Sequence, residues 1–239
     1  MLLPCPEGRI AHLGCRTGYL DADLVRFLGT ASLVGIDCSP EALDLARNKA
    51  AMSNADLQYL EVTELPSPLD GQSFSHVVAL HPIGDLDERG ELLNEMAGLL
   101  YAGGQALVAL PMRGSFVEIA DLLREYALKF DDGDLGKAVD LAWGLRPTIE
   151  SLSEELEGVG LEDVDVELRP MSLSFDSGRA FFEDPSSRLL ILPEIRRSMA
   201  GHDLKKPLEY VREAIDRYWS ETKFELSVVV GCAGARRVD

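Results

Sequence analysis

A short glycine turn followed at a distance by a carboxylate is the part of this sequence best suited to chemistry. Gly14 and Gly18 flank a turn that directly follows an apolar run at 9–13. A second apolar run, 32–36, ends at Asp37. Glycine lets the main chain approach a ligand closely, and a carboxylate at a strand end can accept hydrogen bonds from both ribose hydroxyls. The spacing therefore indicates a nucleoside site.

Each half of this pattern also has a purely structural interpretation. Gly14 and Gly18 could form only a corner between a strand and a helix, because glycines punctuate many such corners. Asp37 could cap the helix that follows it. Ser39 is better placed to be that cap, since Pro40 after it suits the first helical position. We therefore favour the ligand interpretation for the carboxylate.

Apolar runs of strand length alternate with helical patterns through the first half of the chain. Strands separated by helices favour an α/β fold, doubly wound and Rossmann-like, with a mostly parallel seven-stranded sheet whose last strand is antiparallel. The glycine pair Gly103-Gly104 is expected to end the third helix. The segment 131–134 is expected to be a loop, and 175–203 has no clear assignment. The expected strands are 9–13, 32–36, 57–61, 74–80, 105–111, 164–168 and 224–232, and the expected helices are 20–28, 40–52, 88–100, 116–129, 148–159 and 204–219.

The long excursion between the last two expected strands divides the chain. We expect a cofactor-binding domain from 1–170 and 221–239, with 171–220 inserted as a helical cap. A cap lying over the carboxyl ends of the strands is where substrate selectivity would be built. An additional packing layer without contact to a ligand is an equally good interpretation.

Charge and cysteine content exclude several classes of function. The formal charge is 23 − 41 = −18, so the chain would repel phosphate backbones and anionic membranes, and we expect neither nucleic acid nor membrane as partner. The cysteines Cys5, Cys15, Cys38 and Cys232 form no CxxC pair, and the histidines and acids give no metal-ligand spacing. Without an apolar run near the ~18 residues of a membrane span, a cytoplasmic location is expected.

Four segments together resemble one enzyme family. They are His12–Gly18 (HLGCRTG), Gly35–Arg47 (GIDCSPEALDLAR), Glu61–Ser75 with its Leu-Pro and Asp-Gly pairs, and Leu99–Gly104 (LLYAGG). Through them, residues 9–111 resemble the class I S-adenosylmethionine-dependent methyltransferases, in particular the small-molecule and quinone-methyltransferase-like group of type 11. The resemblance continues loosely through 152–168 and 225–237.

The resemblance implies S-adenosylmethionine as cofactor and gives roles to individual residues. The turn would line the methionine part of the cofactor, Asp37 would hold the ribose, and Glu61 would accept from the adenine amino group. The implied cofactor-binding residues are Gly14, Cys15, Arg16, Gly18, Asp37, Cys38, Glu61, Val62 and Leu80, of which Cys38 and Val62 would border the adenine.

Two residues make the first motif degenerate. The family's acidic residue at the end of the first strand meets the cofactor ammonium group, and His12 supplies no fixed negative charge there. Arg16 replaces the middle glycine, where its side chain could either obstruct the ligand or bind the cofactor carboxylate as a bidentate partner. Both alternatives remain open from the sequence. Because only eight residues precede the first strand, the helix that covers the cofactor in relatives is expected to be missing, and a partner protein or a second copy could cover that side.

The base or substrate-positioning group is sought in loops near the expected pocket. The candidates are His81, Asp85 and Tyr19, and His81 is favoured because it follows the fourth strand. A histidine that merely packs on its turn is the alternative. The aromatics of the second half suggest an apolar or aromatic acceptor, although they suit a hydrophobic core equally well: Phe175, Phe181, Phe182, Tyr210, Tyr218 and Trp219.

Three functions are therefore weighed. The preferred one is a methyltransferase acting on a small molecule. A catalytically silent relative that serves as a binding or regulatory partner is the second, motivated by His12 and Arg16. A nucleotide-dependent oxidoreductase is the third, disfavoured because the turn lacks a full GxGxxG.

Overall fold

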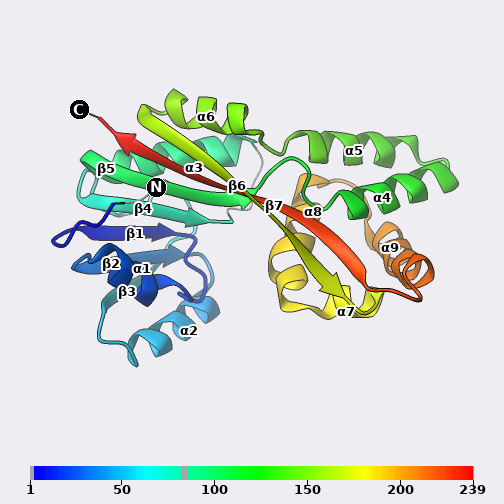
Figure 1. Cartoon of the computed structure of the whole chain (residues 1–239), viewed down its shortest axis with the longest axis horizontal. Coiled ribbons are helices and arrows are strands. Elements are labelled where there is room, and N and C mark those ends of the chain that lie inside the picture. Colours follow the sequence, from blue (N-terminus) through cyan, green and yellow to red (C-terminus); the bar gives the residue numbers. More distant parts are fainter. Residues whose placement is uncertain (1–2, 82–85, 239) are drawn as a thin grey trace.

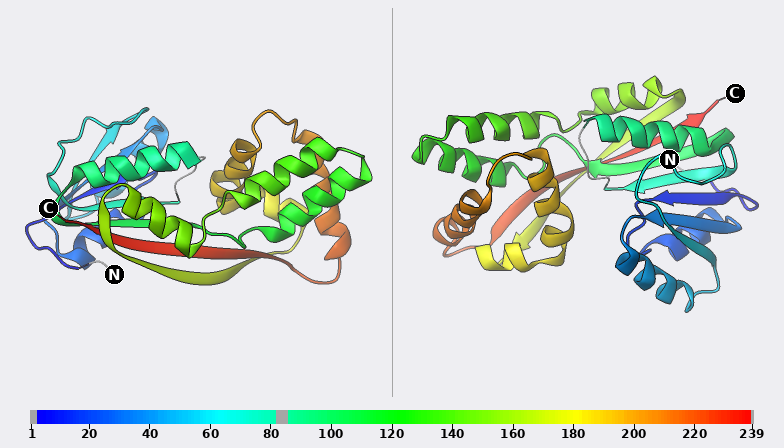
Figure 2. Two further views of the ribbon diagram at one scale, coloured as in Figure 1. Left: turned by 90° about the horizontal axis from the view of Figure 1, so that it is seen from above. Right: turned by 180° about the vertical axis from the view of Figure 1, so that it is seen from behind.

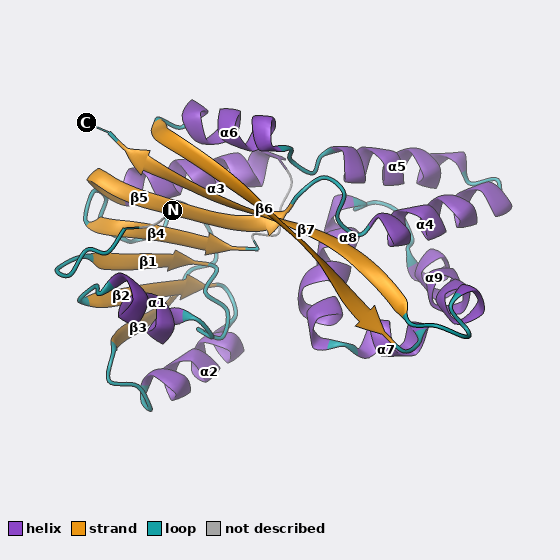
Figure 3. Ribbon diagram, viewed as in Figure 1, coloured by secondary structure: helices purple, strands orange, loops and turns teal. Residues whose placement is uncertain are grey.

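The computed structural model describes residues 3–81 and 86–238. Its strands form one seven-stranded sheet, which is flanked by helices (Figures 1 and 3). The strand order is β3-β2-β1-β4-β5-β7-β6. All neighbours are parallel except β7, which runs antiparallel to both β5 and β6. This confirms the doubly wound fold with an antiparallel last strand. The strands are β1 (Arg9–Leu13), β2 (Ser32–Asp37), β3 (Asp56–Glu61), β4 (Phe74–Leu80), β5 (Leu100–Pro111), β6 (Leu161–Phe175) and β7 (Phe224–Arg237).

Helices cover both faces of the parallel part of the sheet. Residues of α1 and α2 pack with one set of strand side chains, including Ile10 and Leu33, while α3 and α6 pack with the other set, including Ala11 and Leu13. Both faces of β1, β2 and β4 are therefore buried, which explains their nearly continuous apolar sequences. The helices are α1 (Asp21–Leu28), α2 (Pro40–Ala50), α3 (Leu86–Leu99), α4 (Val117–Lys129), α5 (Gly133–Gly144), α6 (Ile149–Gly158), α7 (Gly178–Glu183), the π-helical turn η1 (Ser187–Ile191), α8 (Leu192–Ser198) and α9 (Lys205–Tyr218).

Local capping chemistry sets several helix starts as the sequence predicts. The Ser39 side chain accepts from the Ala42 amide at 3.2 Å, with Pro40 at the first helical position. Thr148 caps α6 in a reciprocal capping box with Ser151. Such caps satisfy amide groups that have no partner inside the helix.

The glycine pair at 103–104 does not end a helix, contrary to the prediction. Helix α3 ends at Leu99 and β5 begins directly at Leu100. The pairing of β4 with β5 jumps from Phe74–Leu100 to His76–Gln105, so the glycines lie in an irregular, bulged part of the strand. A side chain at Gly104 would approach the Tyr101 carbonyl oxygen to 2.9 Å. The glycine is needed for this close approach of main chain rather than for a helix end.

Helix α5 begins inside the segment 131–134, for which the sequence predicts a loop. The Asp132 side chain accepts from the Leu135 amide at 3.0 Å and caps the helix. Leu135, Val139 and Trp143 are then buried against α4. Tertiary packing therefore stabilises a segment whose glycines and acids have low helix propensity.

Strands β6 and β7 extend well beyond the parallel sheet and carry a second group of helices (Figure 2). Its hydrophobic core joins α4, α5, α7, η1, α8 and α9 to the outer ends of the two strands, around Phe175, Phe224 and Leu226. We call this group of elements the cap lobe. The segment 171–220, expected to form the cap, therefore shares its core with α4 and α5, which lie earlier in the chain. Within the described residues, no helix is both long and apolar enough to span a membrane.

Candidate functional site

The glycine turn and Asp37 meet at the carboxyl ends of β1 and β2. The Arg16 amide donates to Asp37 Oδ2 at 2.8 Å, and the Ser39 amide donates to Asp37 Oδ1 at 2.9 Å. Each carboxylate oxygen has lone pairs for about two acceptor interactions, so each retains capacity for a ligand hydroxyl. The turn and the strand-end acid of the sequence pattern thus lie at one place in the structure.

The turn is built from residues in the left-handed region. Gly14, Arg16 and Gly18 have φ values of 68°, 50° and 61°. No atom lies within 4 Å of a side-chain carbon placed on Gly14, whereas one on Gly18 would approach Tyr59 Oη to 2.5 Å and Asp21 Oδ2 to 3.0 Å. Gly14 therefore leaves open space beside the turn, and Gly18 permits close packing beneath it.

A buried polar network lies under the turn. His12 Nδ1 is 2.7 Å from Asp21 Oδ1, and Tyr59 Oη donates to Asp21 Oδ2 at 2.9 Å. Asp21 is fully buried at the start of α1. Burial, followed by the charge of Asp21 and its hydrogen bond, raises the pKa of the Tyr59 hydroxyl. The sequence pattern points to His12 but gives no signal for Asp21 and Tyr59, since the network spans β1, α1 and β3.

The Arg16 side chain bridges two strand ends. Its Nη1 donates to the Leu80 carbonyl oxygen at 3.0 Å and its Nη2 to the His81 carbonyl oxygen at 2.8 Å, both at the end of β4. Burial lowers the pKa of the Arg16 guanidinium, an effect that the Asp37 carboxylate opposes. A guanidinium carries five donors, so three N–H groups are not used in these two bonds. The side chain therefore spans the β1 turn and the β4 end while keeping donors for a ligand anion.

The residues expected at the adenine edge lie at adjacent strand ends. Asp37 and Glu61 are register partners on β2 and β3, and the Val62 amide donates to the Asp37 carbonyl oxygen at 3.0 Å. Glu61 and Cys38 are exposed. The Cys15 thiol is instead buried among α2 and β3 side chains. Burial, the main cause, raises its pKa, so this thiol stays protonated and only the main chain of this residue can border a ligand.

His81 lies where the cap lobe meets the lobe formed by the parallel sheet and its helices. Its backbone has φ 51°, and its amide donates to the Ala109 carbonyl oxygen at 2.6 Å. His81 Nε2 is 3.3 Å from Oε2 of Glu194 on α8, and Oε1 of the same carboxylate pairs with the Arg146 guanidinium. Glu194 and Arg146 gave no signal in the sequence, because they are 113 and 65 positions away from His81.

Burial and charge oppose each other at Glu194. Burial alone would raise the pKa of this carboxyl, but the contact with His81 and the charge of Arg146 more than offset it, and the pKa lies below its ordinary value. Burial lowers the pKa of Arg146, while Glu194 opposes that effect. The carboxylate therefore stays ionised beside the imidazole at neutral pH.

The other residues considered for chemistry are placed as follows. Tyr19 is 81% exposed, with the Lys49 ammonium over its ring. Asp85 lies outside the described residues. His76 is fully buried and bonds to the Ser75 hydroxyl and the Leu3 carbonyl oxygen, each at 2.9 Å. Among the described residues, no group of three or more His, Cys, Asp or Glu side chains is arranged to hold a metal ion.

The aromatics that suggested an apolar acceptor build the cap lobe. Phe175, Phe181 and Tyr210 are buried in its core, and Phe182 and Trp219 pack against that core. Tyr218 is half exposed and donates to Glu125. Their role in packing is sufficient to explain them, so they give no argument for an acceptor class.

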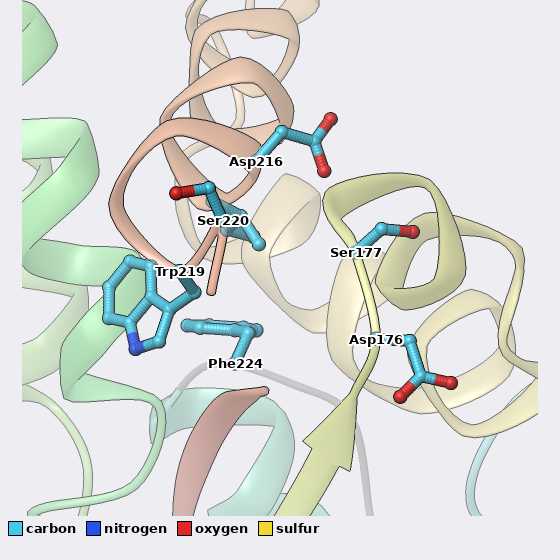
Figure 4. Close-up of a pocket in the computed structure, with 7 residues that line it drawn as sticks. Asp176, Ser177, Asp216, Trp219, Ser220 and Phe224 are labelled. Atoms are coloured by element: carbon cyan, nitrogen blue, oxygen red, sulfur yellow. The ribbon is translucent and has the colours of Figure 1, made fainter. Parts of the chain in front are cut away.

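A hollow of about 240 Å³ opens in the cap lobe, between the end of β6 and α9 (Figure 4). None of the residues lining it belongs to the site predicted from the sequence. Asp216 Oδ1 accepts from the Gly178 amide at 2.7 Å, and Asp176 pairs with Lys223 at 3.1 Å. The carboxylates of Asp176 and Asp216, which line the hollow, therefore both bind partners within the protein.

The first part of the chain is similar to known methyltransferases. Residues 10–104 match the family model described as methyltransferase domain. The ubiquinone biosynthesis O-methyltransferase of Dinoroseobacter shibae is 31% identical over 66% of this chain and 61% of its own length. The ubiquinone/menaquinone biosynthesis C-methyltransferase UbiE of Geotalea daltonii is 28% identical over 52% of this chain and 54% of its own length. The chain spans about half the length of these curated relatives or slightly more.

Solved structures resemble the whole chain in fold. The YcgJ protein of Bacillus subtilis superposes with a TM-score of 0.64 at 11% identity, covering 99% of this chain and 94% of that protein. A protein titled a putative methyltransferase, from Bacillus halodurans, gives a TM-score of 0.62 at 16% identity, covering 99% and 95%. The likeness therefore includes the cap lobe as well as the sheet.

Proposed function

We propose that this chain, which belongs to the class I S-adenosylmethionine-dependent methyltransferase family, transfers a methyl group from S-adenosylmethionine to a small-molecule acceptor. One observation carries the proposal: the Arg16 amide of the glycine turn lies 2.8 Å from Asp37 Oδ2, in a sheet with the order 3-2-1-4-5-7-6. A ligand that reaches both the turn and the acid must have the size of a nucleoside with a further group attached.

The residues present fit the adenosyl part of that cofactor. Asp37 retains acceptor capacity for the ribose hydroxyls, and the open space beside Gly14 is a cradle that a larger side chain would fill. We assign the adenine edge to Cys38, Glu61 and Val62 at the neighbouring strand ends. When bound, S-adenosylmethionine supplies an electrophilic methyl group on a sulfonium, so the protein has mainly to hold and align the reactants.

The methionine end is assigned to the turn itself, with Gly14, Cys15, Arg16 and Gly18 around it and Leu80 opposite. Arg16 bridges this end of the site to β4 through the carbonyl groups of Leu80 and His81. The methionine end must therefore displace this bridge or bond to the unused donors of the guanidinium. We propose displacement. The two bonds hold the Arg16 side chain between the glycine turn and the end of β4, which is where the methionine end would have to lie.

The acceptor is proposed to be a small molecule that enters from the side of the cap lobe. Two of the relatives bear names from ubiquinone or menaquinone biosynthesis, and both carry out methyl transfer according to those names. Helix α8 reaches the end of β4 through the contact between His81 and Glu194. An acceptor lying near His81 would therefore contact both lobes.

Titration calorimetry with S-adenosylhomocysteine and S-adenosylmethionine tests the proposal. We expect micromolar binding that weakens by at least about 100-fold in Asp37→Ala, because two charge-assisted hydrogen bonds to the ribose are lost. Asp44→Ala is the matched control. It removes the same charge from α2, where Asp44 pairs with the exposed Arg47, and it should bind like the wild type.

The contrary outcomes separate the alternatives. Absence of binding at millimolar ligand in a folded wild-type protein would favour a catalytically silent relative that acts as a binding or regulatory partner. Preferential binding of a nicotinamide dinucleotide would favour an oxidoreductase. Equal loss of affinity in Asp37→Ala and Asp44→Ala would remove Asp37 from the site.

Three further expectations stand as proposals of the same kind. The division into a cofactor-binding domain (1–170 and 221–239) and a cap (171–220) is one. Proteolysis would test it, since release of 171–220 without α4 and α5, with which it shares a core, would support that boundary. Coverage of the turn by a partner protein or a second copy is another, which sedimentation analysis would test. A cytoplasmic location is the third.

A further inference from the structure

Three charged or titratable side chains from three separate elements meet at the junction of the lobes. His81 follows β4, Arg146 precedes α6, and Glu194 lies on α8 of the cap lobe. The His81 and Glu194 side chains are 19% and 17% exposed, and that of Arg146 is 7% exposed. The Arg146 guanidinium also lies over the rings of Phe116 and Trp143, at 4.9 and 5.3 Å from their centres. The arginine is thus fixed within the cap lobe, and it holds the carboxylate that faces the imidazole.

The arrangement determines which imidazole nitrogen carries the proton. Glu194 Oε2 lies 3.3 Å from His81 Nε2, and this ion-pair contact is the nearest partner of two buried atoms that have no well-aligned hydrogen bond among the described residues. An ionised carboxylate accepts hydrogen bonds only, so Nε2 carries hydrogen and Nδ1 keeps its lone pair. Within the described residues, no hydrogen bond occupies that Nδ1 atom.

The carboxylate that faces the ring is also held from the other side. Glu194 on α8 is the one carboxylate against the ring within the part of the chain described, and it is already paired with Arg146.

We propose that Glu194 is a positioning residue that holds His81 with its Nδ1 lone pair free, and that His81 thereby takes the proton from a hydroxyl acceptor. The inference rests on the proposed methyl transfer and adds the chemical class of the acceptor. A hydroxyl compound needs such a base, because its oxygen gains a bond to carbon and must lose its proton.

The step balances in atoms and electrons. The acceptor oxygen forms its bond to the methyl carbon while the carbon–sulfur bond breaks, and the sulfur keeps that electron pair and becomes a neutral thioether. The hydroxyl proton passes to His81 Nδ1. The resulting imidazolium lies beside the Glu194 carboxylate, which stabilises the new charge until the proton leaves to solvent.

Nitrogen NMR on the wild-type protein tests the positioning without any acceptor. In ¹⁵N-histidine-labelled protein with S-adenosylhomocysteine at pH 7.5, with the His81 signals assigned through His81→Gln, we expect a neutral ring protonated at Nε2. Exchange of that proton should quicken at least tenfold in Glu194→Gln. Glu183→Gln is the matched control, because Glu183 pairs with Arg179 on the exposed face of α7 in the same lobe.

A mutant cycle on methyl transfer tests the base. With catechol as hydroxyl probe, His81→Gln and Glu194→Gln should each lower kcat 10- to 100-fold or more, and the double variant should be no slower than His81→Gln alone. Trimethylamine serves as the second probe, because its free-base form accepts the methyl group without giving a proton to His81. Its methylation without that of catechol, or losses that multiply in the double variant, would overturn the proposal.

Failure of this inference can be told apart from failure of the proposed function. Calorimetry shows separately whether S-adenosylhomocysteine binds, and only absence of binding rejects the methyltransferase. If it binds, then a His81 ring protonated at Nδ1, or one charged at pH 7.5, rejects the positioning role. This measurement uses the wild-type protein, so it decides the question even if Glu194→Gln does not fold or neither probe is methylated.

Discussion

Nδ1 of His12 lies 2.7 Å from Oδ1 of Asp21, and both side chains are almost completely shielded from solvent. The histidine stands at the end of β1 and the aspartate begins α1, so the contact spans the turn between them. Tyr59 from β3 completes the network. The turn that faces the proposed ligand therefore rests on a buried polar support.

This support should be important for stability. Asp21→Asn removes the charge while leaving His12 and Tyr59 buried, so we expect the free energy of unfolding to fall by about 3 kcal/mol. Urea denaturation at pH 7 measures this change in the free energy of unfolding. Asp23→Asn provides the comparison, since Asp23 pairs with Arg26 at an exposed site and should change stability by less than about 0.5 kcal/mol. Similar losses in both variants would contradict the prediction.

The Arg16 bridge should limit affinity for a ligand with a methionine end. Arg16→Gly removes the two bonds to β4 and relieves a non-glycine residue from positive φ. We expect S-adenosylhomocysteine to bind about tenfold more tightly, a change of about 1.4 kcal/mol, and 5′-methylthioadenosine, which lacks the amino-acid part, to bind as before. Calorimetry measures both. A loss of affinity confined to S-adenosylhomocysteine would show instead that the guanidinium binds the carboxylate.

The two ends of the turn should differ in their tolerance of a side chain. Gly18→Ala forces a methyl group against Tyr59 and Asp21 at positive φ, and should lower the free energy of unfolding by about 3 kcal/mol. Gly14→Ala carries only the cost of positive φ, about 1 kcal/mol, because the space there is open. Thermal and urea unfolding compare the two. Equal destabilisation would mean that the collision beneath Gly18 is relieved by local movement.

The contacts of Glu194 with His81 and Arg146 should make the free energy of unfolding depend on pH in the acidic range. Its pKa lies below the ordinary value of 4.5 because His81 and Arg146 outweigh the effect of burial. The contribution of an acid with a lowered pKa is complete above its unfolded value and is lost as pH falls through its folded value. Glu194→Gln should therefore flatten the decline of unfolding free energy below pH about 4.5, whereas Glu183→Gln should retain it. Parallel curves for the wild type and Glu194→Gln would contradict this assignment.

Much of the parallel sheet could be derived from local patterns. Apolar runs, the cap at Ser39 and the glycine turn act over a few residues, and each fixes backbone geometry by itself. The predicted ends of helices and strands were wrong where tertiary contacts determine them. Gly103-Gly104 lie in a strand bulge and not at a helix end, and α5 forms because α4 buries its apolar side.

The turn, Asp37 and their approach at the ends of two adjacent strands follow from the local sequence pattern, because a strand–helix–strand unit leaves few other arrangements. What Arg16 and His81 contact depends instead on how distant elements pack. Their partners are more than 60 residues away, at the end of β4 and on α8. Hydrogen bonds and ion pairs depend on distances of about 3 Å between atoms, and no periodicity along the chain specifies such distances until the lobes are packed together.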